Sequence, residues 1–268
     1  SRNEKTTSIQ QTASVDLPIF NLNELKLVFG GEDNFNEIKT LLPKSTDLPF
    51  SIFAATLDLI DTESSRLKKI SILSNFFYSI LNSNPNLLVK IIFMMLNRVA
   101  EPYENIEFGI GQQLVTKCIS QMTGMNSKEL QKKLVTYGDL GLLLEAQQMV
   151  QKPLIKPKPL LIGKTFNSLL DMARISGDKS KQIKITKLQE ILTAAKCTET
   201  RYIVRFILLQ MRIGVGEKNI LAALGRAFAA LKYPQIFAAS LDEPKSTEQI
   251  EVKDLFNECV RNFIIAYK

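Results

Sequence analysis

Two similar stretches organise this chain: Phe108-Gly109-Ile110-Gly111-Gln112-Gln113 and Arg212-Ile213-Gly214-Val215-Gly216-Glu217-Lys218. Each places a Gly-x-Gly turn directly before a stretch with helical apolar spacing, Leu114 to Ile119 in the first and Ile220 to Leu224 in the second. Such a turn lets the backbone approach a ligand closely, because glycine has no Cβ. The start of a helix then offers unpaired N–H groups and a partial positive charge to an anion. We therefore expect two sites that bind a polyanion.

The turns also have a structural interpretation, since a glycine pair before a helix is often a tight chain reversal. The second turn has Arg212, Lys218 and Arg226 around it, which favours phosphate binding. No predicted strand precedes either turn, so a dinucleotide-binding site or a P-loop is a poor match.

The composition agrees with an anionic partner. The chain has 268 residues, 45% of them hydrophobic, and carries a net charge of +7 with a pI near 9.2. This excludes wholesale disorder and provides enough apolar side chains for a sizeable core. A basic balance favours a polyanion, although a basic surface without a specific partner is common too.

Catalytic and metal sites are not expected. The chain has no histidine, and its cysteines, Cys118, Cys197 and Cys259, are isolated from one another. Serine nucleophiles therefore lack a histidine partner, and the acid pair Asp58 and Asp61 reads as surface charge on a helix. The polar start resembles no signal peptide and no segment reaches membrane-spanning length, so we expect a soluble protein without a membrane partner.

Helical periodicity dominates the chain and predicts an all-α fold of about twelve helices without significant sheet. Three sequence signals mark helix starts: Asn84 before Pro85, Asn126 with Glu129, and the pair Thr198-Glu199. Residues 1–16 are expected to form a disordered or loosely ordered tail. Proline-rich residues 152–159 are expected to connect two halves, 49–150 and 160–231, which a helix at 246–267 closes.

The two halves are expected to be related by pseudo-symmetry. Leu57-Asp58 and Leu170-Asp171 each precede a turn, basic residues, a long amphipathic helix, an apolar helix and a Gly-x-Gly turn. The basic pair Lys68-Lys69 then has its counterpart in Lys179 and Lys181. Chance similarity among amphipathic helices is the alternative, and the matching glycines favour duplication. These lysines either face phosphate or are solvated surface.

Several ordered motifs carry a resemblance that covers residues 17–267. In the first half they are Ser65-Arg66-Leu67-Lys68, Leu73-Ser74-Asn75, Glu107 to Gly111 and Gly138 to Leu142; in the second they are Pro157 to Leu160, Phe166, Asp171-Met172-Ala173, Ser176-Gly177, Glu199 to Ile203 and, above all, Leu209 to Leu224. Together they resemble the N-terminal DNA-binding domain of eukaryotic ATP-dependent DNA ligases of the ligase I type.

The resemblance implies that residues 17–268 form an all-helical, pseudo-symmetric domain. It implies sequence-independent binding of nicked duplex DNA through minor-groove and phosphate contacts on both sides of the nick. The family's contact segment maps onto Arg212, Ile213, Gly214, Val215, Gly216, Glu217, Lys218, Asn219, Ile220 and Leu221, and a basic contact maps onto Lys68. The first turn adds Gly109 and Gly111. Gly216 and Lys218 are not the commonest residues of that segment, and Lys68 is often Arg, which has the fork geometry that Lys lacks.

Sealing a nick needs parts that this chain does not carry. Ligases of this family form a lysyl-adenylate at a K-x-D-G motif, and the sequence contains no such motif. The resemblance thus implies a segment without a cofactor or catalytic residue of its own, inactive alone, joined in the parent protein to catalytic domains that use ATP and Mg²⁺. It also implies a monomer acting in nuclear DNA replication, repair and recombination.

Two alternatives remain from the residues themselves. The first is an α-helical scaffold that binds protein and not DNA, although a solenoid needs three or more short repeats and the chain shows two long ones. The second is a self-sufficient enzyme, which labelled ATP would reveal through an adenylated lysine.

Overall fold

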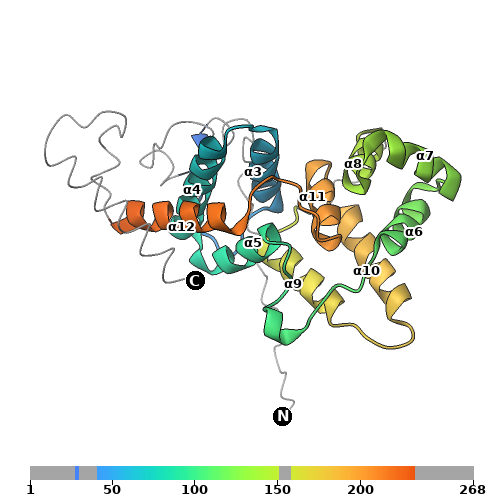
Figure 1. The fold of residues 1–268 in the computed structure, drawn as a ribbon. Coiled ribbons are helices and arrows are strands. Elements are labelled where there is room, and N and C mark those ends of the chain that lie inside the picture. Colours follow the sequence, from blue (N-terminus) through green and yellow to red (C-terminus); the bar gives the residue numbers. More distant parts are fainter. Residues whose placement is uncertain (1–27, 30–40, 151–157, 233–268) are drawn as a thin grey trace, which may run out of the picture.

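The structure, a computed structural model, describes residues 28–29, 41–150 and 158–232. The described part contains ten α-helices and two short 3₁₀ turns and no strand, which confirms the all-α prediction (Figure 1). The first half comprises α3 (Phe50–Thr62), α4 (Arg66–Ser83), η1 (Pro85–Leu87), α5 (Leu88–Met95), η2 (Pro102–Glu104), α6 (Gln112–Thr123), α7 (Ser127–Tyr137) and α8 (Leu140–Val150). The second half comprises α9 (Ile162–Ala173), α10 (Ser180–Ala194), α11 (Thr198–Ile207) and α12 (Glu217–Lys232).

The predicted helix starts are present. Asn84 accepts a hydrogen bond from the N–H of Asn86 at the start of η1, with Pro85 in the first position. The side chain of Asn126 accepts the N–H of Glu129 at 2.9 Å and caps α7. Helix α11 begins at Thr198. Its N-cap is Cys197, and no side chain caps it. Local capping chemistry therefore accounts for the starts of η1 and α7, whereas for α11 the predicted position is right and the capping role expected of Thr198 is not present.

The order of elements repeats between the halves. Helices α3, α4 and α5, a Gly-x-Gly loop and α6 are followed in the second half by α9, α10, α11, a Gly-x-Gly loop and α12. Packing is exchanged between the halves: α4 lies along α12, α10 lies along α6, α11 packs on α3, and α5 packs on α9 (Figure 1). Helices α7 and α8 have no counterpart in the described second half. Neither half encloses its own core.

The backbone segments directly before α3 and α9 are hydrogen-bonded to each other. The N–H of Phe50 donates to the carbonyl of Leu160, and the N–H of Ile162 donates to the carbonyl of Leu48, both at 2.8 Å. This isolated antiparallel bridge fixes the starts of α3 and α9 side by side. The carboxylate of Asp47 then accepts the N–H groups of Gly163 at 2.8 Å and Lys164 at 3.0 Å, so the first half caps the first helix of the second.

The ends of α5 and α11 share an uncommon backbone conformation. Asn97 and Leu209 both have a φ of 55°, which a leucine rarely adopts. In each case the following residue, Arg98 or Gln210, donates its N–H back across the helix end, at 2.8 Å, to Phe93 and Arg205 respectively. The same helix ending at equivalent places supports the predicted duplication.

One hydrophobic core spans both halves and anchors the loops. Phe108, which precedes the first Gly-x-Gly, packs edge-on against Phe206 of α11 with ring centroids 5.2 Å apart. Phe206 in turn stacks on Phe166 of α9, which stacks on Phe93 of α5. Ile213, which precedes the second Gly-x-Gly, is buried in the same core. Each loop is thus tethered by an apolar residue directly before its first glycine.

Three predicted segments lie outside the described residues: the tail at 1–16, most of the proline-rich connection at 152–157, and the closing helix at 246–267. Among the described helices, none has both the length and the hydropathy needed to cross a membrane.

Candidate nucleic-acid interface

The first loop ends in an exposed helix start. Gly109 has a φ of 57°, a conformation that favours glycine, and Gly111 is the N-cap of α6 without any side-chain cap. The N–H groups of Leu114 and Val115 are the first to bond back to the carbonyl of Gly111. The N–H groups before them belong to the helix positions that a ligand or water satisfies.

The second loop repeats this geometry. Gly214 has a φ of 65°, and the N–H groups of Asn219 and Ile220 are the first to bond back, both to the carbonyl of Gly216. The backbone thus presents the same pattern of N–H groups at the starts of α6 and α12. This equivalence was predicted from the glycines alone.

The side chains of the predicted contact segment divide into two groups. Exposed at the surface are Arg212, Gly214, Gly216, Glu217 and Lys218, while Val215, Asn219 and Leu221 are half-buried. Ile213 and Ile220 are buried in the core, so any contact they make with a ligand is through backbone. Their side chains belong to the core, because each lies on the inner side of the turn into α12.

Arg212 fixes the second loop against the first half. Its φ of 55° turns the side chain across the surface, where its guanidinium donates to the carbonyl of Gly138 at 3.1 Å and to Oε1 of Gln210 at 3.0 Å. A depression of about 160 Å³ lies here, lined by Gly111 and Gln112 of the first loop, Gly138, and Arg212. The first loop and Arg212, the residue that opens the second loop, therefore border one depression.

Lys68 lies at the exposed start of α4, next to the second loop. The hydroxyl of Ser65 caps this helix, and Nε of Arg66 donates to Oδ1 of Asn219 at 3.0 Å. Because α4 also lies along α12, the predicted contacts Lys68 and Lys218 belong to adjoining helix starts. Leu67 between the two basic residues is 74% exposed.

Two other lysines reach beneath the loops. Lys69 of α4 donates to the carbonyl of Ile213 at 2.9 Å, and Lys184 of α10 donates to the carbonyl of Phe108 at 2.6 Å. The sequence-based match of Lys68-Lys69 with Lys179 and Lys181 was therefore wrong in register: Lys184 is the counterpart of Lys69. Lys184 was not singled out from the sequence. The one available signal was its position directly before Ile185, on the apolar face of an amphipathic helix.

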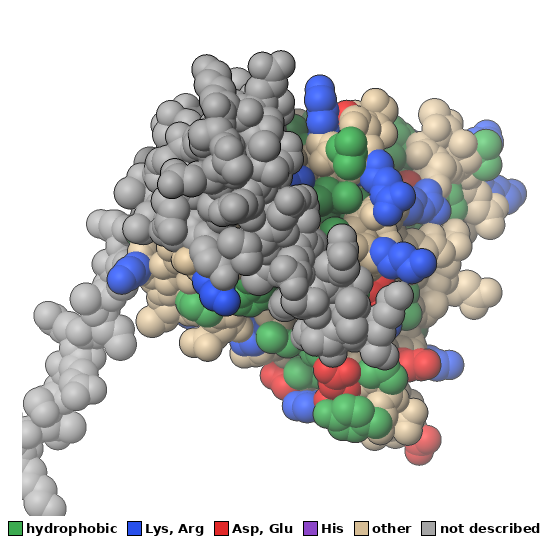
Figure 2. Space-filling model, turned by 60° about the vertical axis from the view of Figure 1, so that its left-hand side comes forward, with side chains coloured by type: hydrophobic (Ala, Val, Ile, Leu, Met, Phe, Trp, Pro, Cys, Tyr) green, Lys and Arg blue, Asp and Glu red, His purple; other side chains and the backbone are tan. Residues whose placement is uncertain are grey.

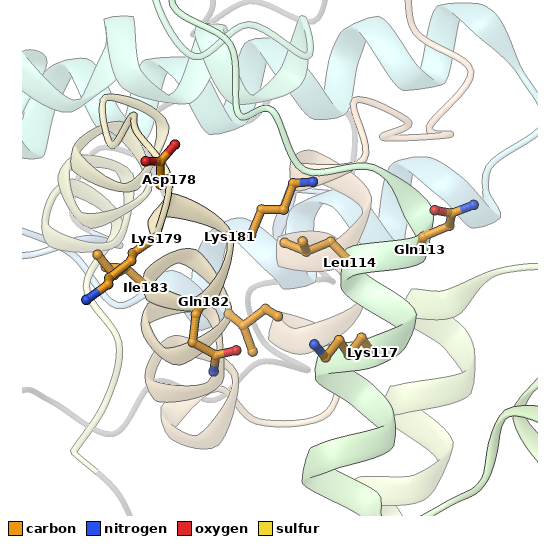
Figure 3. Close-up of a pocket in the computed structure, with 9 residues that line it drawn as sticks. Gln113, Leu114, Lys117, Asp178, Lys179, Lys181, Gln182 and Ile183 are labelled. Carbon is orange, nitrogen blue, oxygen red and sulfur yellow. The ribbon is translucent and has the colours of Figure 1, made fainter.

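A groove of about 570 Å³ runs between α6 and α10. Figure 3 shows Lys117 of α6 and Lys181 of α10 extending into the gap between the helices, whereas Lys179 points away from α6. Asp178 is the acidic residue that lines it. In the repeated order of elements, α6 corresponds to α12 and α10 corresponds to α4, so this groove lies at the place equivalent to the contact of α4 with α12.

An ion-pair network supports the interface from within. Arg201 of α11 pairs with Asp58 of α3 at 2.5 Å, and Arg205 pairs with Asp61 at 2.9 Å and Asp139 at 2.6 Å. Burial opposes the charge of Arg205, but its hydrogen bonds to the two aspartates outweigh burial and raise its pKa. Asp58 and Asp61 were interpreted as helix surface charge, and this was wrong, because the fold places the half-buried Arg201 and the buried Arg205 against them.

The described residues contain no cluster of three or more cysteine, aspartate or glutamate side chains suited to a metal ion. Burial raises the pKa of Cys118 to about 12, so its thiol stays protonated at neutral pH. Burial also raises the pKa of Cys197.

Charge is unevenly spread over the molecular surface. Figure 2 shows Lys and Arg side chains spread over much of the described part of one face, whereas most of the visible acidic side chains lie toward its lower edge. Basic side chains on one part of a surface create the potential that draws a polyanion.

Comparison with known proteins identifies the family. The family model described as DNA ligase N terminus matches residues 49–225, more than half of the chain, and this range contains both glycine loops. The chain belongs to the DNA ligase N-terminal family.

Individual ligases are similar to this ligase domain along most of its length. DNA ligase 1 of Dictyostelium discoideum is 30% identical over 227 residues, 84% of this chain and 19% of the relative. DNA ligase 1 of Saccharomyces cerevisiae is 33% identical over 184 residues, 68% of this chain and 24% of the relative. DNA ligase 2 of Korarchaeum cryptofilum is 32% identical over 178 residues, 65% of this chain and 29% of the relative. The ligase domain thus spans about a fifth to three tenths of these relatives.

Proposed function

We propose that this ligase domain binds nicked duplex DNA without sequence preference, through minor-groove and phosphate contacts. In the parent protein, it would position the nick for ATP-dependent sealing by the catalytic domains. The observation that carries the proposal is the pair of equivalent helix starts, α6 and α12. The start of α6 and Arg212, the residue that opens the second loop, line one depression. Two N–H-rich starts at a fixed spacing suit the two strands of a duplex.

The exposed side chains support binding to the DNA backbone. Lys68, Arg212 and Lys218 are exposed and positively charged, and such residues neutralise phosphates without reading bases. Leu67, exposed between basic neighbours, offers an apolar contact to the sugars that wall the minor groove. Specific base recognition would call for side chains directed at base edges, and the loops are built mainly from backbone and glycine.

Sealing itself belongs to the proposed parent protein. ATP and Mg²⁺ would act at its catalytic domains, and the work of this segment would be to hold the substrate. We extend the proposal to a monomeric parent that acts in the nucleus in DNA replication, repair and recombination. The names of the relatives as DNA ligases support the part of the proposal that concerns sealing by the parent protein.

Binding of the segment to a fluorescent nicked duplex tests the proposal. We expect a Kd on the order of 10⁻⁴–10⁻⁶ M at physiological salt. The affinity should fall steeply as the salt concentration rises, because phosphate contacts release counterions. Fluorescence anisotropy at 50 and 200 mM salt measures both quantities. A segment that binds no DNA at low salt, yet captures an acidic protein partner, would favour the scaffold alternative.

Arg212→Ala tests the role of the loop. We expect weaker binding by a similar factor on duplexes of different sequence, because a phosphate contact carries no sequence information. Lys128→Ala is the matched control, since Lys128 is exposed near the start of α7, about 15 Å along that helix from Gly138. A loss confined to one sequence would contradict phosphate positioning.

A further inference from the structure

Lys69 lies directly behind the second loop. Its Nζ donates to the carbonyl of Ile213 at 2.9 Å, so the residue before Gly214 is held inward. A Cβ added at Gly214 would lie 3.0 Å from the same Nζ. The ammonium group therefore occupies the side of the loop that the missing glycine side chain leaves open.

Lys184 repeats this arrangement at the first loop. Its Nζ donates to the carbonyl of Phe108 at 2.6 Å, and a Cβ at Gly109 would lie 3.3 Å from it. The lysine is only 7% exposed, and burial lowers its pKa. Within the described residues, neither Lys69 nor Lys184 forms an ion pair. Two positive charges thus lie under two glycine loops with carbonyl oxygens as their protein partners.

The exchange between the halves makes the arrangement reciprocal. Lys69 comes from α4 of the first half and supports the loop of the second, while Lys184 comes from α10 of the second half and supports the loop of the first. Lys184 is buried, and a buried cation is costly unless an anionic group compensates its charge. Lys69 is half-buried and interacts electrostatically with the Glu63 carboxylate, so its charge is less costly to hold there. The loops are the places where we propose that DNA phosphates bind, which would supply this compensation.

We propose that Lys69 and Lys184 are positioning residues for DNA binding, each of which fixes the other half's Gly-x-Gly loop and adds its charge to the hold on the phosphate there. The inference rests on the proposed function and deepens it. Gly109 and Gly214 are required for this arrangement, because a side chain at either position would press against the ammonium group and displace it from beneath the loop. The exposed basic residues then act on the outside of the loops, and these two lysines act from beneath.

Methionine substitutions at the two lysines test the proposal. Lys69→Met and Lys184→Met keep the length of the side chain and remove the charge. Each should weaken binding to the nicked duplex about three- to ten-fold at 50 mM salt. Each should also make the negative slope of log K against log salt shallower by up to about 0.9. The loss should accordingly shrink about three-fold between 50 and 200 mM salt. Lys69→Arg and Lys184→Arg should retain the slope, and Lys128→Met should leave affinity and slope nearly unchanged.

The outcomes separate a charge role from a purely structural one. Variants that melt at lower temperature but bind with an unchanged salt slope would overturn the proposal, and so would unchanged binding. If a methionine variant does not fold, the wild-type segment decides: the ¹⁵Nζ signals of Lys69 and Lys184 should shift when nicked duplex is added, and that of Lys128 should not. Unmoved Lys69 and Lys184 signals in a bound complex overturn the inference alone. A wild-type segment that binds no DNA overturns the proposed function and this inference together.

Discussion

Individual glycines in this domain have opposite tolerances for a side chain. A Cβ at Gly141 would lie 2.6 Å from the carbonyl oxygen of Arg201 and 3.1 Å from its Cα, so α8 and α11 are in backbone contact there. At Gly111 no atom lies within 4 Å of the added Cβ, and the φ of −86° is one that any residue adopts. One glycine is therefore required by packing, and the other is not.

Alanine at each of these glycines tests the distinction. Gly141→Ala should lower the free energy of unfolding by about 1–3 kcal/mol, because two helix backbones must separate to admit the methyl group. Gly111→Ala should cost less, up to about 1 kcal/mol, because the added methyl group meets no atom and the cost is only that of alanine at the N-cap of α6. Urea unfolding followed by circular dichroism measures both. Equal stabilities for the two variants would show that α8 and α11 do not approach as closely as described.

At the scale of elements, α11 is held by charge as well as by apolar contacts. Asp139 joins three elements: its Oδ1 accepts the N–H of Gly141 at the start of α8, at 2.6 Å, and its Oδ2 accepts from Arg205 of α11, which also pairs with Asp61 of α3. Both Asp139 and Arg205 are buried. A charge buried in this way depends on its partner, since water cannot replace it.

Asp139→Asn removes that partner charge with little change of shape. We expect a loss of about 3 kcal/mol in the free energy of unfolding, at the low end for a broken buried pair, because Asp61 still contacts Arg205. Glu104→Gln is the matched control: Glu104 and Arg174 form a solvent-accessible pair at 3.9 Å, and its loss should cost less than about 1 kcal/mol. Thermal or urea unfolding of the two variants at neutral pH checks this, and a control as damaging as Asp139→Asn would contradict the assigned role.

The elements differ in how far sequence could predict them. Helix starts such as Asn84-Pro85 and Asn126 depend on local capping chemistry, and the glycine loops depend on local backbone freedom, so both were predicted correctly. The pairing of Asp58 with Arg201 links residues 143 positions apart, and no local pattern encodes it. The same holds for Lys184, whose partner carbonyl lies 76 positions away. Contacts that depend on which helices exchange between the halves became visible only with the fold.

At the scale of the whole molecule, the exchange of helices makes each half depend on the other. Helix α4 lies along α12, α3 contacts α11, and α6 packs on α10, so the main apolar faces of the first half are covered by the second. The segments that lead into α3 and α9 also bond to each other, because the N–H groups of Phe50 and Ile162 donate to backbone carbonyls of the other half. An isolated half would expose these faces and leave the polar backbone groups unpaired.

Separation of the chain into residues 1–150 and 158–268 should therefore leave both fragments without a cooperative fold. We expect low thermal cooperativity and poor dispersion of amide NMR signals for each fragment alone, and recovery of helical signal and DNA binding when the two are mixed. The intact segment should unfold in one transition, seen equally by helical and aromatic signals, because both halves share one core. If residues 1–150 alone unfold cooperatively and bind nicked duplex, the halves are independent units, and a binding surface assembled from two interlocked repeats is the wrong description.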